Sequence, residues 1–232
     1  MGNVKQPGLE VYNLPITSYD DGLRLQQKLV IEVQQSVRPD TLLLLEHSPV
    51  ITLGRGWREE NVLKSHEWLT EQGIDVRETN RGGDVTFHGP GQLVGYPIID
   101  LGQRGEDLHR YLRDLEQTIV RSLTDFGVQG TSGADPTGVW VNGRKIAAIG
   151  IHVQRWVTSH GFALNVNSDL SAFDLIVPCG LVGREVTSLE RELGCRQDMD
   201  KVTESITAAF SEIFACRATT KNADELLQPC NR

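Results

Sequence analysis

Hydrophobic positions along the chain follow two periods, one typical of helices and one typical of strands. Apolar residues from Leu23 to Val37 recur at near-helical spacing, which predicts a helix over residues 20–37. The strongest helical pattern covers residues 106–126, where leucine and isoleucine line one face and Gly127 provides a stop. Two shorter helices are predicted over residues 65–72 and 202–214.

The remaining apolar runs predict strands over residues 41–46, 50–53, 74–78, 93–101, 138–141, 145–153 and 157–166. The dipeptide Asn142-Gly143 favours a hairpin between two of them. Because helices and strands do not follow a strict βαβ rhythm, we expect an α/β fold of the α+β type, with a mixed β-sheet flanked by helices. The length indicates a single domain over residues 1–232, with a polar and frayed C-terminal tail at residues 216–232.

Composition and charge narrow the classes of function. The chain has 39% hydrophobic and 23% charged residues and a net charge of -8, which argues against non-specific binding to nucleic acid or to an anionic membrane. No apolar run approaches the ~20 residues of a membrane span and no signal peptide is evident, so we expect a cytoplasmic protein. The four cysteines match no zinc spacing; we expect no metal site, and the cysteines to be thiols.

A glycine-rich stretch over residues 81–96 is the first candidate for chemistry. Its five glycines allow the backbone to approach a ligand closely, and in an extended segment Thr86 and His88 would share one face, with Val85 and Phe87 on the other. The pattern is neither a dinucleotide-binding fingerprint nor a phosphate-binding loop. The alternative interpretation is a plain turn that connects two strands.

Cys179 is the second candidate, because it lies between Pro178 and Gly180 and could be presented on a loop. A thiolate attacks a thioester well, but it needs a nearby cation or a helix N-terminus that lowers its pKa. The alternative is a small buried side chain, which is the common fate of a free cysteine.

Lys145 is the candidate cation, at the start of the strand that follows Asn142-Gly143. Regular alternation would put Lys145 on the same face as Ala147, Ile149 and Ile151, and desolvation against that apolar wall would favour its use as a base. The alternative is a solvated lysine at the end of a hairpin.

Three segments together resemble the octanoyltransferases of lipoate synthesis, the lipoyl(octanoyl) transferases. They are RGGDVTFHGPGQLVGY at residues 81–96, GRKIAAIG at residues 143–150 and Pro178-Cys179-Gly180, in the order and at the separations that the family shows. The similarity covers residues 41–214, which would form the catalytic core.

The resemblance implies the catalytic fold of the biotin and lipoate protein ligases and a reaction without a cofactor. An octanoyl group would pass from octanoyl-acyl carrier protein to Cys179, and then to a lysine of lipoyl domains in 2-oxoacid dehydrogenase complexes and the glycine cleavage H protein. Lys145 would activate the thiol. The acyl channel would be lined by Arg81, Gly82, Gly83, Asp84, Val85, Thr86, Phe87 and His88, by Ala148, Ile149 and Gly150, and by Gly161, Phe162 and Ala163.

Two further expectations concern the surroundings of the reaction. Backbone N–H groups near Gly180 or in Gly82-Gly83 are candidates for stabilising the oxyanion. An acidic carrier protein would dock on a local basic rim, for which the candidates are Arg55, Arg58, Arg77, Arg144, Arg155 and Arg184. The alternative functions are an ATP-dependent lipoate or biotin ligase, a thioesterase, and a module that only binds acyl carriers or lipoyl domains.

Overall fold

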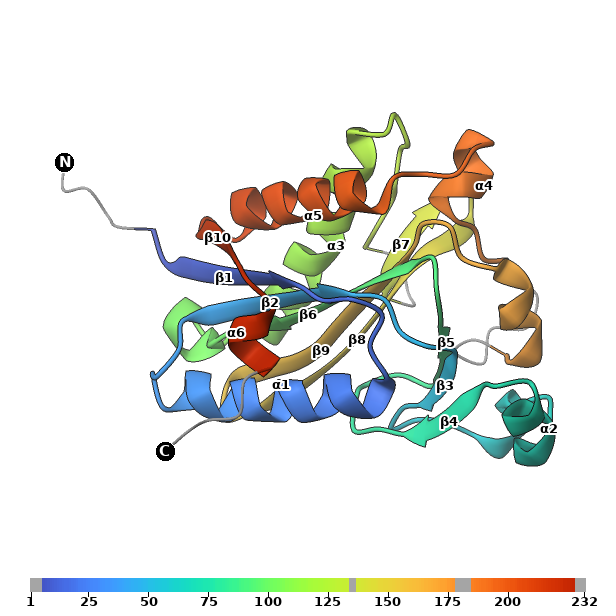
Figure 1. The fold of residues 1–232 in the computed structure, drawn as a ribbon. Helices are drawn as coiled ribbons and strands as arrows, with labels where there is room; N and C mark the ends of the chain where they lie inside the picture. The colour runs from blue at the N-terminus through green and yellow to red at the C-terminus, as the bar shows by residue number, and fades with distance from the viewer. Residues whose placement is uncertain (1–5, 134–136, 178–184, 228–232) are drawn as a thin grey trace.

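The computed structural model describes residues 6–133, 137–177 and 185–227. Its largest element is a seven-stranded mixed sheet with helices on both faces (Figure 1). The strand order is β10-β1-β2-β6-β9-β8-β7, with β1 Gly8–Asn13, β2 Asp40–Leu45, β6 Gln92–Ile98, β7 Gly138–Val141, β8 Arg144–Gln154, β9 Val157–Asn165 and β10 Arg217–Lys221. Strand β1 is parallel to both of its neighbours, whereas all other adjacent pairs are antiparallel.

A second sheet of three strands lies beside one end of the first. Its order is β4-β3-β5, with β3 Val50–Leu53, β4 Asp75–Glu78 and β5 Val85–His88. Helix α2 (His66–Glu71) and the 3-10 helix η3 (Leu170–Leu175) supply Leu69 and Phe173 to the small core behind these strands.

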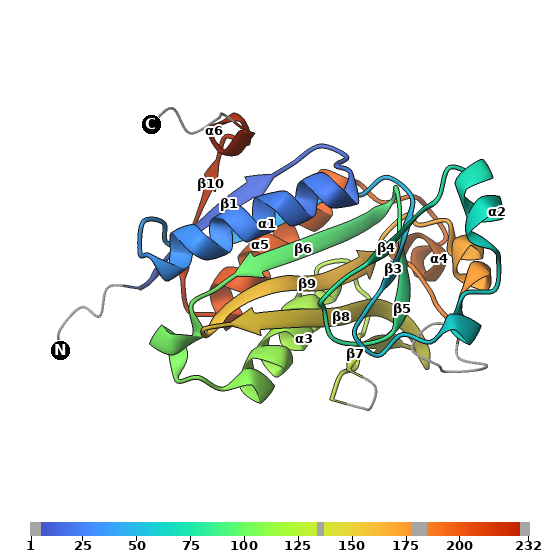
Figure 2. The same ribbon diagram turned by 90° about the horizontal axis from the view of Figure 1, so that it is seen from below.

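The main sheet is buried on both faces, as alternation along β2 demonstrates. Leu42 and Leu44 belong to the core under α3 (Leu108–Thr124) and α5 (Met199–Ile213), while Leu43 and Leu45 belong to the core under α1 (Tyr19–Gln34). Figure 2 shows α1 across one face and α3 and α5 behind the other. Ser18 caps α1 and Asp107 caps α3, each through a side-chain oxygen that accepts a backbone N–H.

The predicted helices and the predicted mixed sheet are confirmed, and the seven expected strands fall within a few residues of β2, β3, β4, β6, β7, β8 and β9. Strand β5, which lies inside the glycine-rich stretch, was not among the expected strands. The remaining short helices are η1 Glu59–Asn61, η2 Leu101–Arg104, α4 Leu189–Leu193 and α6 Asp224–Leu227. No helix in these described ranges is long and apolar enough to span a bilayer.

The expectation of a frayed C-terminal tail is wrong over its first part. Residues Arg217–Lys221 form β10, which pairs with β1 in register from Gly8↔Arg217 to Tyr12↔Lys221. The preceding Cys216 is 4% exposed and contributes to the core. A polar sequence can form an edge strand because its order comes from pairing with β1 and from the packing of a single small residue, Ala218, on the core.

Candidate active site

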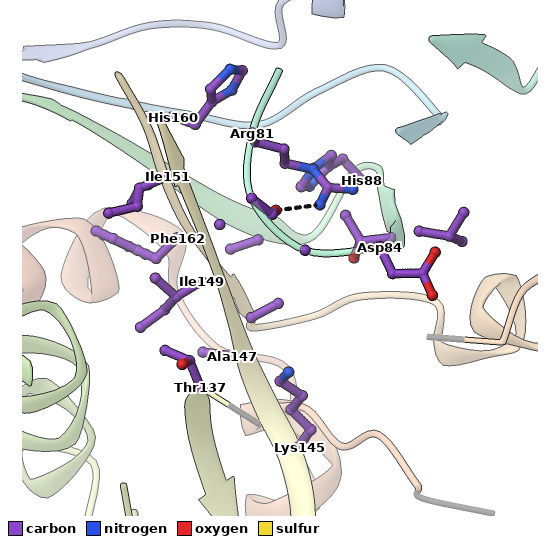
Figure 3. Close-up of a pocket in the computed structure, with 18 of the residues that line it drawn as sticks. Arg81, Asp84, His88, Thr137, Lys145, Ala147, Ile149, Ile151, His160 and Phe162 are labelled. Carbon is purple, nitrogen blue, oxygen red and sulfur yellow. Dashed lines mark hydrogen bonds between the residues drawn. The ribbon is translucent and has the colours of Figure 1, made fainter. Parts of the chain in front are cut away.

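A cavity of about 960 Å³ opens between the main sheet and the loop that precedes β5 (Figure 3). The cavity follows β8. Strand β7 pairs with β8 only as far as Ala148, so in the described part of the chain the segment of β8 beyond Ala148 has no neighbouring strand on that side. Lining residues therefore come from both faces of the sheet. Most of the predicted channel residues are among them, namely Arg81, Gly82, Gly83, Asp84, Val85, Thr86, His88, Ala148, Ile149, Gly150, Gly161, Phe162 and Ala163.

The loop at residues 81–84 is fixed by the buried guanidinium of Arg81. This group donates to the carbonyl oxygen of Thr52 (2.7 Å), to its hydroxyl (2.9 Å) and to the carbonyl of Gly82 (3.0 Å). The N–H of Gly82 donates to the carbonyl of Ile151 (2.8 Å), which joins the loop to β8. Because that N–H is already used, Gly82 is not a donor for an oxyanion, and of the pair expected from the sequence only Gly83 stays a candidate.

Gly54 supports this loop, although the sequence predicts only that Gly54-Arg55-Gly56 forms a loop after a strand. A Cβ at Gly54 would lie 2.7 Å from Arg81 Nη1 and 2.9 Å from the carbonyl oxygen of Asp84, and closer still to the carbonyl of Gly83. The 81–84 loop therefore packs directly on the backbone that follows β3. Its motif could be recognised from the sequence, but this distant partner could not.

Strand β5 divides its side chains between a core and the cavity, as alternation predicts. Thr86 and His88 line the cavity. Phe87 does not, contrary to the expectation for this residue: its ring packs edge-on against Phe173, with 6.0 Å between ring centroids. Val85 belongs to the same core but also reaches the cavity wall.

His88 begins a buried chain of amide hydrogen bonds. Gln92 Nε2 donates to the Phe87 carbonyl and to Asn165 Oδ1 (2.9 Å), so Gln92 Oε1 accepts from His88 Nδ1 at 2.7 Å. This orientation puts the proton of the neutral imidazole on Nδ1 and makes Nε2 an acceptor. Asn165 Nδ2 continues the chain to the carbonyl of Thr187 (3.0 Å), whose own N–H donates to the carbonyl of Lys145 (2.9 Å).

The end of the cavity near α1 is polar and aromatic, which the motifs did not predict. Tyr19, Tyr96 and His160 line it, and His47 lies behind them with Nε2 2.7 Å from the Tyr96 hydroxyl. Burial lowers the pKa of His88 to about 3, with a further decrease from His47, and burial also lowers the pKa of His160 to about 3. These imidazoles are therefore neutral at pH 7.

Lys145 does not share a face with Ala147 and Ile149, and the prediction from regular alternation is wrong. A bulge shifts the register, because Val139 pairs with Ala147 while the next residue, Trp140, pairs with Lys145. Ile146 and Ala147 consequently both enter the core under α3. Lys145 projects to the opposite side, with Gly138 and Trp140.

The surroundings of Lys145 make it a buried amine at the cavity. Its side chain lines the cavity, the residue is 9% exposed, and Nζ lies 5.4 Å from the centroid of the Trp140 ring. Its backbone N–H donates to the carbonyl of Glu185 (2.9 Å). The structure confirms that Lys145 is buried, as expected from the sequence, but its neighbours are Gly138 and Trp140 rather than Ala147 and Ile149.

Cys179 lies outside the described residues, as does Arg184. The chain on both sides of that segment reaches the cavity, since Val177 and Val186 are lining residues. Of the other cysteines, Cys195 is exposed and Cys216 is buried. Within the described ranges no group of three or more His, Cys, Asp or Glu side chains is arranged to hold a metal ion.

Only part of the expected basic rim lies near the cavity. Arg58 lines it and forms an exposed ion pair with Glu60 (3.6 Å), and Arg55 is exposed in the adjacent loop. Two other candidates are held in ion pairs, Arg77 with Asp20 (3.0 Å) and Arg144 with Glu192 (2.8 Å). Arg155 lies in the β8–β9 turn, at the far end of β8 from Lys145, so it is wrongly placed for this role.

Comparison with known proteins identifies the family of the chain. A family model described as the lipoyl protein ligase A/B catalytic domain matches residues 18–211. An octanoyltransferase from Rubrobacter xylanophilus is 50% identical over 213 residues, which are 90% of this chain and 96% of that protein. An octanoyltransferase from Myxococcus xanthus is 48% identical over 89% of this chain, and the match covers 59% of that longer protein.

Among solved structures, a putative lipoate protein ligase from T. acidophilum with bound lipoic acid has a TM-score of 0.73 and 16% identity, over 95% of this chain and 91% of that one. This likeness shows the ligase fold, and the expectation for the fold is confirmed. Taken with a buried lysine and a glycine-rich loop at one large cavity, the comparisons show that the chain belongs to the lipoyl protein ligase A/B catalytic domain family and, within it, to the octanoyltransferases.

Proposed function

We propose that the chain transfers an octanoyl group from octanoyl-acyl carrier protein to a specific lysine of a lipoyl domain, through a thioester on Cys179. In the first step the Cys179 thiolate attacks the donor thioester, and the thiol of the carrier leaves. In the second step the amine of the acceptor lysine attacks the enzyme thioester, an amide forms, and the Cys179 thiol leaves. Each step starts from an activated acyl group, so neither needs ATP.

The observation that carries this proposal is a buried lysine on a large cavity that also has apolar walls. Lys145 lines this cavity, and Ile149, Phe162 and Ala163 contribute apolar surface to its walls. Burial of an acyl chain contributes about 0.8 kcal/mol per CH₂ group, so octanoyl would gain a few kcal/mol there. Val177 precedes Cys179 by two residues in sequence and lines the same cavity.

The role proposed for Lys145 is proton transfer. Neutral Lys145 would take the proton of the Cys179 thiol, stabilise the thiolate during attack on the donor, and give the proton to the departing thiolate of the carrier. Neutral again, it would accept a proton from the incoming lysine and pass it to the departing Cys179 thiolate. The acceptors would be lipoyl domains of 2-oxoacid dehydrogenase complexes and the glycine cleavage H protein, as expected from the family. The cytoplasmic location and the docking of an acidic carrier protein at Arg55 and Arg58 stay predictions.

Intact-mass spectrometry tests the proposal most directly. The full chain is mixed with octanoyl-acyl carrier protein in the absence of ATP, and we expect a mass increase of one octanoyl group. The adduct should be absent in Cys179→Ser and should form more slowly in Lys145→Ala. A lipoyl domain added afterwards should take up the acyl group, whereas release of free octanoate would indicate a thioesterase.

Cys195→Ser is the matched control, because Cys195 is an exposed thiol that we expect to be uninvolved. It should acylate normally. An adduct that persists in Cys179→Ser, or one that requires ATP, would contradict the thioester mechanism and favour the ligase alternative.

A further inference from the structure

We propose that Glu116 on α3 is a positioning residue for Lys145, because its carboxylate fixes Gly138 against the lysine side chain. This inference rests on the proposed function, since it presumes that Lys145 takes part in acyl transfer. Glu116 belongs to none of the sequence motifs and does not line the cavity.

Glu116 is a carboxylate in an apolar interior. The residue is 0% exposed, and its helix buries Leu115, Ile119 and Leu123 around it. A buried carboxylate loses hydration, so a fold retains one only where hydrogen bonds or an ion pair compensate. Glu116 has both kinds of partner, an ion pair with Arg113 Nη1 (2.6 Å) and a hydrogen bond in which the N–H of Gly138 donates to Oε1 (3.0 Å).

The two partners of Glu116 differ in burial, and therefore in whether water could replace the carboxylate as their partner. The Arg113 side chain is 53% exposed, so water can replace its contact with the carboxylate. The Gly138 N–H bond is buried, and this donor would be left unsatisfied without Glu116. The carboxylate therefore anchors the first residue of β7.

Gly138 touches Lys145 directly. A Cβ placed on Gly138 would lie 2.6 Å from Lys145 Cε, 2.7 Å from the carbonyl oxygen of Ala147 and 3.3 Å from Lys145 Nζ. The φ angle of Gly138 is +148°, which residues other than glycine rarely adopt. The lysine side chain consequently packs between Gly138 and the Trp140 ring. Glu116 holds Gly138 in place through the hydrogen bond from its N–H.

Single-turnover octanoylation of the full chain by octanoyl-acyl carrier protein tests the inference. Glu116→Ala should lower the maximal acylation rate about 10-fold or more, because Lys145 loses its alignment, while the donor concentration at half-maximal rate stays within about threefold. Glu116→Gln should restore the rate to within about threefold of wild type, because its amide oxygen can accept the same Gly138 N–H.

Ser122→Ala is the matched control on the same helix. Ser122 is 1% exposed and its hydroxyl lies 2.9 Å from that of Ser205 on α5, away from β7. It should lower the melting temperature without slowing acylation. A wild-type rate in Glu116→Ala, a rate in Glu116→Gln as low as in Glu116→Ala, or an equal loss in Ser122→Ala would each overturn the inference.

Two further variants separate this inference from the function on which it rests. Fast acylation in Lys145→Ala would refute the role of the lysine itself, whereas slow Lys145→Ala with fast Glu116→Ala would refute only the positioning role. If Glu116→Ala does not fold, Gly138→Ala examines the same link, because it keeps the carboxylate and adds a methyl group against Lys145 Cε. We expect slow acylation there as well, and a wild-type rate would overturn the inference.

Discussion

At the scale of single residues, the face on which Lys145 lies depends on one extra residue in β8. The bulge at Ile146 and Ala147 turns Lys145 out of the core under α3 and places it beside Trp140, which is its cross-strand partner. A cation near an aromatic face gains about 0.5 to 2 kcal/mol, with the larger values where water is excluded. Trp140 is 6% exposed, so water is excluded from its contact with Lys145 and the larger values apply.

We expect Trp140→Leu to slow acylation of the enzyme about 3- to 30-fold, because the lysine loses its aromatic wall. Trp140→Phe keeps a ring and should retain most of the rate. Acylation reactions quenched at several times and analysed by intact-mass spectrometry give the rate for both variants. Trp156→Leu, at a residue that is 39% exposed, is the control and should behave as wild type; equal rates in Trp140→Leu and wild type would exclude the ring from any part in the reaction.

The sequence was sufficient for predicting most of the residues that line the cavity but not for orienting all of them. The glycine-rich motif predicted the loop of Arg81 and the inward face of His88, because both depend on local backbone. The direction of Lys145 depends on a register shift against a neighbouring strand, which no local pattern encodes. Tyr19 was missed at the cavity because it lies within an ordinary helix pattern, and Tyr96 because only the part of the motif up to His88 was assigned to the channel.

At the scale of elements, two glycines allow β6 and β9 to support the cavity. A Cβ on Gly161 would lie 2.5 Å from Pro97 Cδ and still closer to the Gly95 carbonyl, and one on Gly95 would overlap the Phe162 ring. The sequence resemblance assigned Gly161 to the channel, and the structure adds a packing reason for it. Strands β1, β5 and β10 were not among the predicted strands, since β1 and β10 carry no strong apolar alternation and β5 lies inside the glycine-rich stretch.

Gly161→Ala should lower the free energy of unfolding by about 1–3 kcal/mol, because a methyl group there forces β6 and β9 apart. Gly8→Ala is the matched control in β1, where a Cβ meets nothing within 4 Å, and it should change stability by no more than about 0.5 kcal/mol. Urea unfolding followed by circular dichroism measures both. Similar stabilities for the two variants would show that the strands can separate at no cost.

At the scale of the whole molecule, the cavity carries a group of neutral histidines inside an acidic protein. Burial lowers the pKa of His88 and of His160 to about 3, whereas an unfolded histidine titrates near 6.5. Between these values the unfolded chain binds protons that the folded chain does not. Stability from this source is therefore complete above about pH 6.5 and is lost as the pH falls toward 3.

The free energy of unfolding should accordingly decrease on acidification from pH 7 to pH 4, by up to about 1.4 kcal/mol per pH unit for each of the two histidines. His160→Asn removes one titrating group and should reduce this slope, whatever its effect on stability at pH 7. His109→Asn, at an exposed position on α3, should leave the slope unchanged. Urea titrations at several pH values measure the slopes, and identical slopes in all three proteins would rule out the buried His160 as a source.

The pairing of β10 with β1 has a practical consequence for anyone who attaches this enzyme to a support. These strands form one edge of the main sheet, and β2, β6 and β9 separate them from β8 at the cavity. With a spacing of about 4.8 Å between adjacent strands, β1 lies about 19 Å from β8. A linker joined beside Gly8 or Lys221 would hold the molecule by the edge of the sheet opposite β8, so that the support lies away from Lys145 and a lipoyl domain could still approach it.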